Sequence, residues 1–176
     1  MSLLIISASL NPASKSRRLA QAASAALTHD GITHTQLDLR DFPLPLCDGG
    51  SAYADSHVAQ ATQLISTATG IIVASPIYNY DVNAALKNLL ELTGKSWLDK
   101  TVSFLVAAGG QSSYMSVMGV ANSLMLDFRC VIVPRFVYAA PGDFDDNGSP
   151  GSAIIARVEA CARATALLVR QRGRID

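Results

Sequence analysis

The sequence predicts an α/β fold in which helices cover both faces of a parallel sheet, and three observations lead to this prediction. Short apolar runs without polar alternation occur along the chain, as in strands that are buried on both sides. These runs alternate with longer segments whose apolar residues recur at helical spacing, the arrangement of repeated βαβ units. Of the 176 residues, 49% are hydrophobic and only 16% are charged, whereas about 25% are charged in an ordinary soluble domain. This composition suits elements that are buried on two faces.

The first strand and the first helix lie near the start of the chain. Residues 3–7 form the continuous apolar run L-L-I-I-S, which predicts a buried strand. From Ser16 onward, apolar residues recur at helical spacing, and Gly31 stands where a helix C-cap is expected. We therefore expect a helix between these two residues.

A second strand, at an edge of the sheet, is expected over residues 32–39. Polar and apolar residues alternate there, with Leu37 and Leu39 facing inward. Residues 40–56 contain prolines and glycines and show no period, so we interpret them as a working loop and not as a domain boundary. A helix near residues 55–68 follows.

The middle of the chain repeats this alternation of strand and helix. Residues 70–75 form a second buried run, G-I-I-V-A-S, and we expect this strand to end at Ser75. Apolar residues at helical spacing predict a helix over residues 82–93, and residues 101–108 are again typical of a strand.

The C-terminal part supplies a helix, a strand and a final helix, over residues 114–128, 131–138 and 155–169. Five strands that alternate with helices form right-handed βαβ units. The expected architecture is a three-layer sandwich around a five-stranded parallel sheet with the flavodoxin-like strand order 2-1-3-4-5. We expect a single domain over residues 1–176, because a chain of this length builds one core.

In this strand order the topological switch point lies between the first and third strands, so a ligand is expected on the loops at their carboxyl ends. The first of these loops, residues 7–18, reads S-A-S-L-N-P-A-S-K-S-R-R. Hydroxyls and free backbone N–H groups at a helix N-terminus suit a phosphate. The loop lacks the glycine patterns of dinucleotide-binding and Walker loops. The alternative is that Ser14 or Ser16 only caps the helix.

The loops after the third and fourth strands suit a flat heteroaromatic ligand. Residues 75–92 read S-P-I-Y-N-Y-D-V-N-A-A-L-K-N-L-L-E-L and combine backbone amides with tyrosines. The alternative is that Pro76 only ends the strand and that Tyr78 and Tyr80 are ordinary surface residues. The glycine pair at residues 109–110 allows a ligand to approach the backbone closely, although turn chemistry alone would also explain it.

Together these segments resemble the NAD(P)H-dependent FMN reductase family of flavodoxin-like flavoproteins. The resemblance rests on S-L-N-x-x-S-x-S over residues 9–16 of the first loop, on S-P-I-Y-N-Y-D-V-N-A-A-L-K-N-L-L-E-L and on A-A-G-G, and it covers nearly the whole chain. The middle motif is the most specific, and the chain looks most similar to the small members that supply reduced flavin. The resemblance implies that Ser9, Ser14 and Ser16 bind the FMN phosphate, that Pro76, Ile77, Tyr78 and Asn79 meet the isoalloxazine, and that Gly109 and Gly110 lie near its pyrimidine side.

Three departures from the family pattern bear on flavin binding. Asn11, which we count among the cofactor-binding residues, stands where the family often has Arg, and Ala8 stands where it often has Gly. These two changes suggest weaker flavin binding, with FMN exchanging as a substrate. Tyr80 replaces a frequently small residue and could cover part of the flavin ring.

Charge and cysteine usage argue against several other classes of protein. Fourteen Lys and Arg residues balance fourteen Asp and Glu residues, whereas nucleic-acid and anionic-membrane binders need a net positive field. The three cysteines lack C-x-x-C spacing, so we expect reduced thiols in the cytoplasm and no metal site. No apolar run suits a signal peptide or a membrane span.

The three histidines show no catalytic or metal spacing. The aspartates of residues 143–146 predict a turn and not a calcium loop.

The predicted function is NAD(P)H-dependent reduction of FMN, in which a hydride passes from the nicotinamide C4 to the flavin N5. The loops offer no acid, base or nucleophile in a catalytic pairing, so we expect no catalytic side chain. The nicotinamide cofactor is NADPH or NADH, because Lys15, Arg17 and Arg18 either meet a 2′-phosphate or lie on the helix surface. Two alternatives stay open: a quinone or azo-dye reductase with bound FMN, and a non-enzymatic electron carrier of flavodoxin type.

The expected partners are FMN, the nicotinamide nucleotide and further copies of the chain. Apolar residues beside the main helical stripes predict a homo-oligomer, and the family resemblance points to a homodimer or homotetramer. The helical residues in question are Leu92, Met115, Val117, Val120 and Leu124. Tyr53 and the proline-rich residues 42–46 also place apolar groups in an expected surface loop. A flavin-dependent monooxygenase is the partner expected to receive reduced flavin, and neither nucleic acid nor a membrane is expected to bind.

Overall fold

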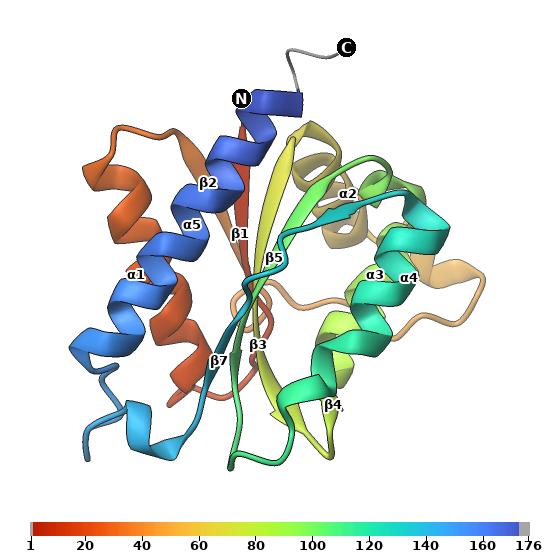
Figure 1. The fold of residues 1–176 in the computed structure, drawn as a ribbon. Coiled ribbons are helices and arrows are strands. Elements are labelled where there is room, and N and C mark those ends of the chain that lie inside the picture. The colour runs from red at the N-terminus through yellow and green to blue at the C-terminus, as the bar shows by residue number, and fades with distance from the viewer. Residues whose placement is uncertain (1, 173–176) are drawn as a thin grey trace.

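The computed structural model describes residues 2–172, in which one sheet lies between two layers of helices (Figure 1). The sheet has seven strands; β2, β1, β3, β5 and β6 lie side by side in that order and pair in parallel. In addition, β7 pairs with β5 in parallel, and β4 pairs with β3 in antiparallel fashion. The strands are β1 (Leu3–Ser7), β2 (His34–Asp38), β3 (Gly70–Tyr78), β4 (Asp81–Val82), β5 (Thr101–Ala107), β6 (Val131–Ile132) and β7 (Val137–Ala139).

The predicted flavodoxin-like order 2-1-3-4-5 is confirmed, with two differences in the number of strands. The last predicted strand is divided into β6 and β7, because residues 133–136 leave the sheet around Pro134, whose nitrogen has no hydrogen to donate to a strand ladder. The short strand β4 was not predicted. It exists because the chain turns back on β3 immediately beyond the main sheet.

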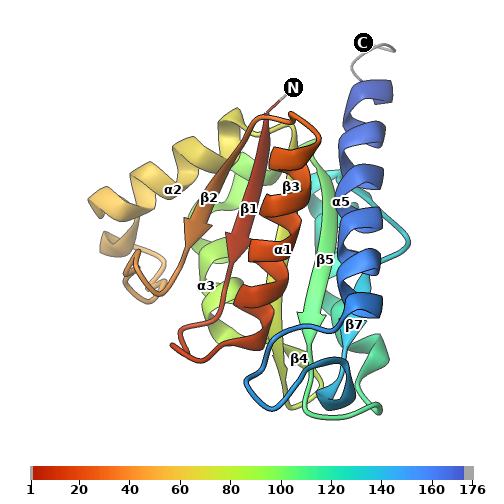
Figure 2. The same ribbon diagram turned by 90° about the vertical axis from the view of Figure 1, so that its left-hand side faces the viewer.

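The helices form two layers, as two perpendicular views show (Figures 1 and 2). One face of the sheet is covered by α1 (Lys15–His29) and α5 (Ser152–Arg172), and the other by α2 (Ser56–Thr67), α3 (Ala84–Thr93) and α4 (Met118–Phe128). Four short 3₁₀ helices occur at Ser51–Ala54, Gly94–Trp97, Tyr114–Val117 and Pro141–Asp143. Of the helices in residues 2–172, none is both long and apolar enough to cross a membrane.

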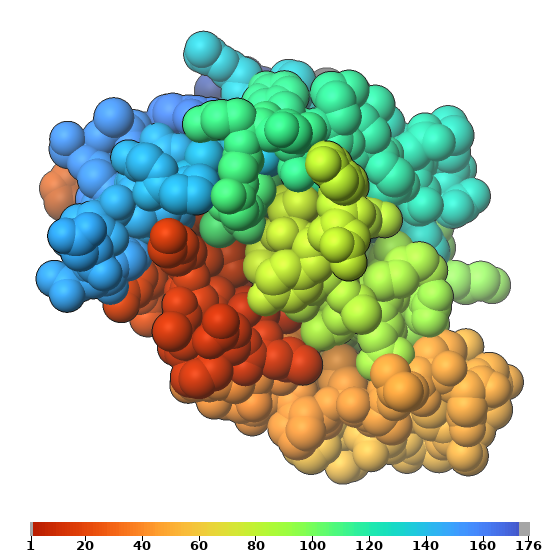
Figure 3. All heavy atoms as spheres, turned by 90° about the horizontal axis from the view of Figure 1, so that it is seen from below, coloured from red at the N-terminus to blue at the C-terminus, as the bar shows by residue number. Residues whose placement is uncertain are grey.

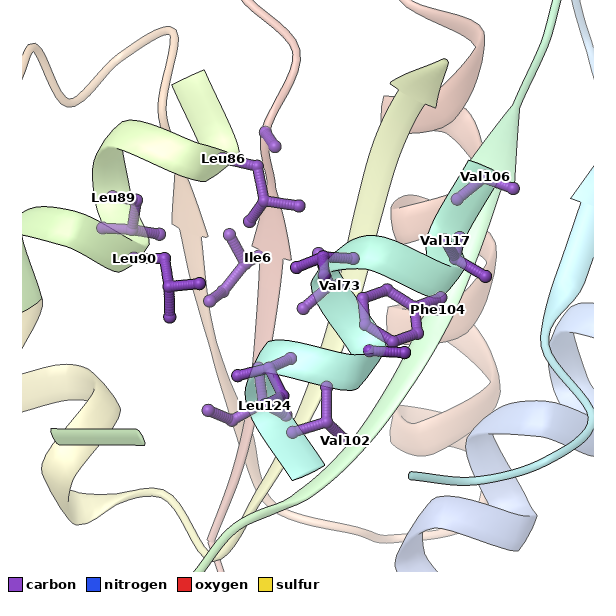
Figure 4. Close-up of a cluster of buried hydrophobic side chains, with 14 of the residues drawn as sticks. Ile6, Val73, Leu86, Leu89, Leu90, Val102, Phe104, Val106, Val117 and Leu124 are labelled. Carbon is purple, nitrogen blue, oxygen red and sulfur yellow. The ribbon is translucent and has the colours of Figure 1, made fainter. Parts of the chain in front are cut away.

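Alternate residues of the central strands supply the two cores. In β1, Leu3 and Ile5 pack in the cluster formed with α1 and α5, while Leu4 and Ile6 belong to the cluster on the opposite face. Figure 4 shows Ile6 together with Leu86 of α3 and other apolar side chains of this second cluster. Burying one such side chain contributes roughly 1.5–3 kcal/mol, so both helical layers are held to the sheet mainly by apolar contact.

The boundaries of two middle elements differ from the sequence prediction. Strand β3 does not end at Ser75 but continues through Pro76 to Tyr78, where it forms a hairpin with β4. The two hairpin residues, Asn79 and Tyr80, adopt left-handed backbone conformations with φ of 49° and 66°. Because the hairpin uses residues 81–82, helix α3 begins only at residue 84.

The end of the first helix is as predicted. Gly31 adopts φ of 67°, a conformation that glycine tolerates without strain, and its N–H donates to the Thr28 carbonyl at 3.0 Å. The predicted edge position of the second strand is confirmed as well. Its residues Leu37 and the following Leu39 are buried against the core.

Most of the helical residues that we expected at an oligomer surface lie in the core, whereas Leu46 and Tyr53 of residues 40–56 are exposed. Leu92 packs beneath the Ser51–Ala54 turn with Ala52 and Val58, because that turn covers the outer side of α3. Val117, Val120 and Leu124 are buried in the cluster on the α2–α4 face. Only Met115 of the five residues is exposed, with 63% of its surface accessible. The apolar residues exposed in this region are Tyr114, Met115, Met118, Met125 and Leu126.

Candidate functional site

Three loops that leave the carboxyl ends of β1, β3 and β5 meet at one end of the sheet. Figure 3 looks onto this end and shows the first loop beside the β3–β4 hairpin and the loop after β5, with residues 141–150 on its other side. These are the loops that the strand order predicts to carry a ligand. The residues that we predicted for the site lie in these loops, in the first turn of α1 or, for Pro76, Ile77 and Tyr78, at the end of β3.

The first loop ends in a helix N-terminus that is lined with buried hydroxyls. Ser9, Ser14 and Ser16 are 1%, 6% and 1% exposed. Ser14 is the N-cap of α1 and accepts a hydrogen bond from the Arg17 N–H at 3.1 Å, so the capping interpretation is correct for this serine. Ser16 does not cap the helix; its hydroxyl lies 3.0 Å from that of Ser14.

Backbone donors remain free beside these hydroxyls. Within residues 2–172, the N–H groups of Leu10, Lys15 and Ser16 make no hydrogen bond. Asn11 shapes the loop, because its Oδ1 accepts from the Ala13 N–H at 2.9 Å and its own N–H donates to the Ser9 hydroxyl at 3.3 Å. Free N–H groups at the positive end of a helix dipole form a site for an anion.

The three cations next to this loop all have partners of their own. Arg17 is buried and pairs with Asp38 of β2, so it neither lies on the helix surface nor faces a 2′-phosphate. Arg18 donates to the Ser149 hydroxyl at 3.0 Å, and the Lys15 ammonium lies 5.0 Å from the centre of the Phe144 ring. The anion site is therefore built from hydroxyls and amides, with its nearest cations occupied elsewhere.

Asn83 joins the first loop to the second. Its Nδ2 donates to the Ala8 carbonyl at 2.7 Å, and its Oδ1 accepts from the Ser75 hydroxyl at 3.1 Å. All three groups are buried. Sequence analysis missed Asn83, although an asparagine just before a helical pattern is a signal for an N-cap, and Asn83 occupies that position in α3.

The hairpin places two tyrosines outside the core. Tyr78 and Tyr80 are 55% and 69% exposed, as the surface interpretation expects, whereas Pro76 and Ile77 are buried. The other alternative, that Pro76 only ends the strand, is wrong because β3 continues beyond it. Asn79 and Tyr80 hold the tight turn that aims this segment away from the sheet.

The third loop is held by a residue that sequence analysis did not single out. The Tyr138 hydroxyl of β7 donates to the Gly110 carbonyl at 2.5 Å and accepts from the Ser113 N–H at 3.2 Å. Tyr138 is only 5% exposed. Its position in a strand-like apolar run gave no signal of this role.

Turn chemistry does not explain the glycine pair of this loop. Neither Gly109 nor Gly110 has a positive φ, and a Cβ atom added to either would meet no atom within 4 Å. Across the described part of the chain, the amides of residues 109–112 also make no hydrogen bond. The loop thus leaves open space and free donors together, which is what close approach of a ligand to the backbone requires.

A profile of the NADPH-dependent FMN reductase family matches residues 1–145. The chain belongs to this family. The family motifs in the three loops are therefore carried on a chain whose fold and free backbone donors agree with a nucleotide-binding site.

Individual relatives bear related names. The chain is 30% identical to an NAD(P)H-dependent FAD/FMN reductase of Geobacillus thermodenitrificans over 63% of this chain, and it spans only 61% of that relative. It is 30% identical to an NADH-dependent FMN reductase of Pseudomonas fluorescens, over 85% of this chain and 82% of the relative. An NADPH:quinone oxidoreductase of Arabidopsis thaliana is 30% identical, over 72% of this chain and 70% of the relative.

Solved structures agree on the flavodoxin-like fold. The chain superposes on an NAD(P)H:(acceptor) oxidoreductase of Paracoccus denitrificans with a TM-score of 0.77 at 16% identity, covering 97% of both chains. It also superposes on an archaeal flavodoxin with a TM-score of 0.69 at 12% identity, covering 97% of this chain and 99% of the flavodoxin.

The histidines and cysteines of this family member lie outside the three loops. Burial raises the pKa of the Cys130 and Cys161 thiols, which keeps both thiols neutral. His34 contacts the Ser24 hydroxyl at 2.7 Å on the outer side of α1. Within residues 2–172, no group of three His, Cys, Asp or Glu side chains could hold a metal ion.

The predicted turn at the C-terminal aspartates is confirmed. The Asp143 carboxylate accepts from the Ala140 N–H at 2.8 Å, and that of Asp145 accepts from the Ser149 N–H at 2.7 Å. These bonds shape the segment that contacts the start of α1 through Arg18.

Proposed function

We propose that this chain is an NAD(P)H-dependent FMN reductase that binds FMN across the three loops. The observation that carries the proposal is the N-terminus of α1, where three free backbone N–H groups stand beside the buried hydroxyls of Ser9, Ser14 and Ser16. A phosphate monoester accepts many hydrogen bonds and carries negative charge, so it fits this end of a helix.

The other loops have the chemistry that the rest of FMN needs. Residues 76–78 offer an extended backbone beside the exposed rings of Tyr78 and Tyr80, and Gly109 and Gly110 offer free amides in open space. Amides suit the ring heteroatoms of a flavin, and aromatic faces suit its planar surface. Asn11 holds the first loop in the shape that exposes its donors.

When bound at the three loops, FMN would supply the redox chemistry, namely hydride acceptance from NADH or NADPH and electron transfer to an acceptor. The protein contributes orientation of the rings and hydrogen bonds from the residue 109–112 amides, which stabilise negative charge at the pyrimidine side. The three loops hold Ser, Asn, Gly and Tyr without a His, Cys or carboxylate pair. We therefore assign no side chain the role of general acid, base or nucleophile.

Within residues 2–172, each cation beside the α1 N-terminus contacts another group, and Arg17 is paired with a carboxylate, which supports exchange of FMN. Hydrogen bonds to a charged group contribute about 1.5–3 kcal/mol each, and an added unshared arginine would strengthen them. Since Lys15, Arg17 and Arg18 are all engaged, FMN is held less tightly than a permanent prosthetic group.

The decisive experiment is an absorption spectrum of the purified protein with and without added FMN, followed by assays of NADH and NADPH oxidation. We expect flavin to bind, and expect nicotinamide oxidation to depend on added FMN. A protein that binds FMN but oxidises neither nicotinamide nucleotide would be an electron carrier of flavodoxin type. A protein that binds no flavin would refute the proposal.

Quinone reduction is the second candidate. The Arabidopsis relative carries that activity in its name, and the chain has an apolar pocket of about 450 Å³ beside the site. The pocket lies between Leu10 of the first loop, residues 39–46 and the first turn of α3 at Ala84 and Ala85. Comparing turnover with free FMN, a quinone and an azo dye distinguishes the candidates, and preference for the quinone would favour this one.

We further propose that the protein is a cytoplasmic homodimer or homotetramer. The exposed apolar residues of the Tyr114–Val117 turn and α4, including Met118 and Leu126, support an association surface. The three free cysteines support a reducing compartment. Reduced FMN released from this enzyme would serve a flavin-dependent monooxygenase. Light scattering tests the assembly, and a monomer mass at micromolar concentration would refute it.

A further inference from the structure

Arg17 makes an unusual set of contacts for a residue in the first turn of a helix. Its side chain is 10% exposed, and its Nε and Nη2 donate to the two carboxylate oxygens of Asp38 at 2.5 and 2.7 Å. Its Nη1 donates to the Asn11 carbonyl at 3.2 Å, and Nη2 also reaches the Ser9 carbonyl at 3.3 Å. One guanidinium therefore connects the end of β2 with the two carbonyls that flank Leu10.

These contacts fix the direction of the loop backbone. The carbonyls of Ser9 and Asn11 turn toward the buried guanidinium, while the N–H of Leu10 between them stays unpaired within the described residues. A planar guanidinium provides the donors in a fixed fork, which an ammonium group cannot reproduce. Arg17 thus affects the candidate anion site indirectly, by fixing the backbone of the first loop.

Resting on the proposed function, we propose that Arg17 is a positioning residue for the FMN phosphate and that Asp38 holds Arg17 in place. The Asp38 carboxylate neutralises the guanidinium charge, so Arg17 does not serve as a phosphate ligand itself. Its effect is to pre-form the first loop so that the loop donors and the hydroxyls of Ser9 and Ser14 meet the phosphate without rearrangement.

A small cavity makes this pair testable by substitution. The cavity measures about 50 Å³ and is lined by Ser7, Arg17 and Asp38 among others. The Ser7 hydroxyl is buried and has no partner there. A cavity of this size with several polar groups admits water. In a variant with a shorter side chain at Arg17, water can therefore hydrogen-bond the polar groups that lose the guanidinium. We expect such variants to fold.

The chain contains a matched control for the ion pair itself. Arg163 of α5 donates through Nε and Nη2 to both carboxylate oxygens of Asp30, at 2.6 and 3.4 Å. Asp30 follows the far end of α1, about 22 Å along the helix axis from the first loop. Arg163→Ala removes an arginine–aspartate pair of the same kind without touching the candidate site.

The experiment measures FMN and riboflavin binding by fluorescence titration, with thermal unfolding of each variant as a check on folding. Riboflavin has the same ring system as FMN but lacks the phosphate. We expect Arg17→Ala and Arg17→Lys to weaken FMN binding about tenfold or more, since several charge-assisted contacts depend on the loop. Riboflavin binding should change less than about threefold, and Arg163→Ala should leave both ligands unaffected.

Asp38→Asn separates positioning from direct binding. If Arg17 contacted the phosphate, removing its carboxylate partner would free the positive charge and tighten FMN binding. Because Arg17 acts by holding the loop, we expect Asp38→Asn to weaken FMN binding and to spare riboflavin.

Three outcomes would overturn the inference. They are tighter FMN binding in Asp38→Asn, full FMN affinity in Arg17→Lys, and equal loss of FMN and riboflavin in the Arg17 variants. Each leaves the proposed function intact, because the wild-type chain still binds FMN. A wild-type chain that binds no flavin would overturn the proposed function and this inference together.

Discussion

The Asn83 side chain donates to the Ala8 carbonyl at 2.7 Å across a sequence separation of 75 residues. The same side chain accepts from the Ser75 hydroxyl, so one buried amide joins the residue after β1 and Ser75 of β3 to the start of α3. The first and second ligand loops are therefore not independent. A change at Asn83 should affect both.

We predict that Asn83→Ala lowers stability and flavin affinity together. The substitution leaves the buried Ala8 carbonyl without its side-chain donor, which costs about 1–3 kcal/mol, and the Ser75 hydroxyl keeps, as a donor, only its bond to the Pro76 carbonyl. Thr165→Val is the control, because the buried Thr165 hydroxyl also donates across elements, to the Ser103 hydroxyl near the start of β5, but lies away from the loops. Both variants should unfold at lower temperature, and only Asn83→Ala should weaken FMN and riboflavin. Unchanged flavin affinity in a folded Asn83→Ala would contradict this coupling.

The serine loop offers a second prediction that separates capping from binding. Ser14→Ala removes the N-cap of α1, and Asp55→Ala removes that of α2, each at a cost of about 1 kcal/mol of stability. Only Ser14→Ala should also weaken FMN, about tenfold, because a hydrogen bond to a charged phosphate is lost. The double variant Ser9→Ala/Ser14→Ala should weaken FMN far more than riboflavin. Equal weakening of the two ligands would rule out the phosphate assignment.

The glycine pair should tolerate alanine in the folded protein but not in the flavin complex. Gly109→Ala and Gly110→Ala meet no atom within 4 Å and need no positive φ, so stability should stay constant or rise by about 0.4–1 kcal/mol. Gly119→Ala in α4 is the control, with equal space around it. Isothermal titration should show loss of flavin affinity for the loop variants alone. Full affinity in both loop variants would mean that the ligand does not approach this backbone.

Tyr138→Phe tests the support of the third loop. The substitution removes only the hydroxyl that links the Gly110 carbonyl with the Ser113 N–H. We expect little change in the packing of the ring, a loss of about 1–2 kcal/mol in stability, and weaker flavin binding because the loop is less well ordered. Tyr53→Phe is the control, since that hydroxyl contacts the Cys47 thiol at a site remote from the loops. Equal flavin affinity in the two variants would show that the Tyr138 hydroxyl does not order the site.

The elements that sequence analysis predicted well are those defined by local pattern. Strand β1 has the predicted bounds because an apolar run that is buried on both faces needs no information from elsewhere in the chain. The predicted end of β3 at Ser75 was wrong, because the hairpin with β4 depends on strand pairing beyond the main sheet. No run of residues along the chain reveals such pairing. The split of the last strand at Pro134 was readable in principle, since proline disrupts a strand ladder.

The site was predicted through its backbone loops, while the residues that hold those loops were missed. Arg17 and Asp38 are 21 residues apart, Tyr138 and Gly110 are 28 apart, and Asn83 and Ala8 are 75 apart. Each contact joins elements that become neighbours only in the folded sheet. A pattern that is read along the chain finds candidate positions for ligand contact, but it does not pair the residues that support those positions.

The last prediction concerns the mechanism, in which no side chain has an obligatory chemical role. Each histidine and each cysteine is replaced singly by alanine; these are His29, His34, His57, Cys47, Cys130 and Cys161. Hydride transfer needs orientation of two rings and no proton donor at the rate-limiting step, so single-turnover flavin reduction should stay within a few-fold of the wild-type rate. Burial raises the pKa of two of the thiols, which further disfavours a thiolate nucleophile.

Gly110→Ala is the positive control and should lower the observed rate by crowding the ring site. General acids and bases contribute about 10²–10⁴-fold, so a loss of more than about a hundredfold in one variant that still binds FMN would identify a catalytic side chain and refute this mechanism.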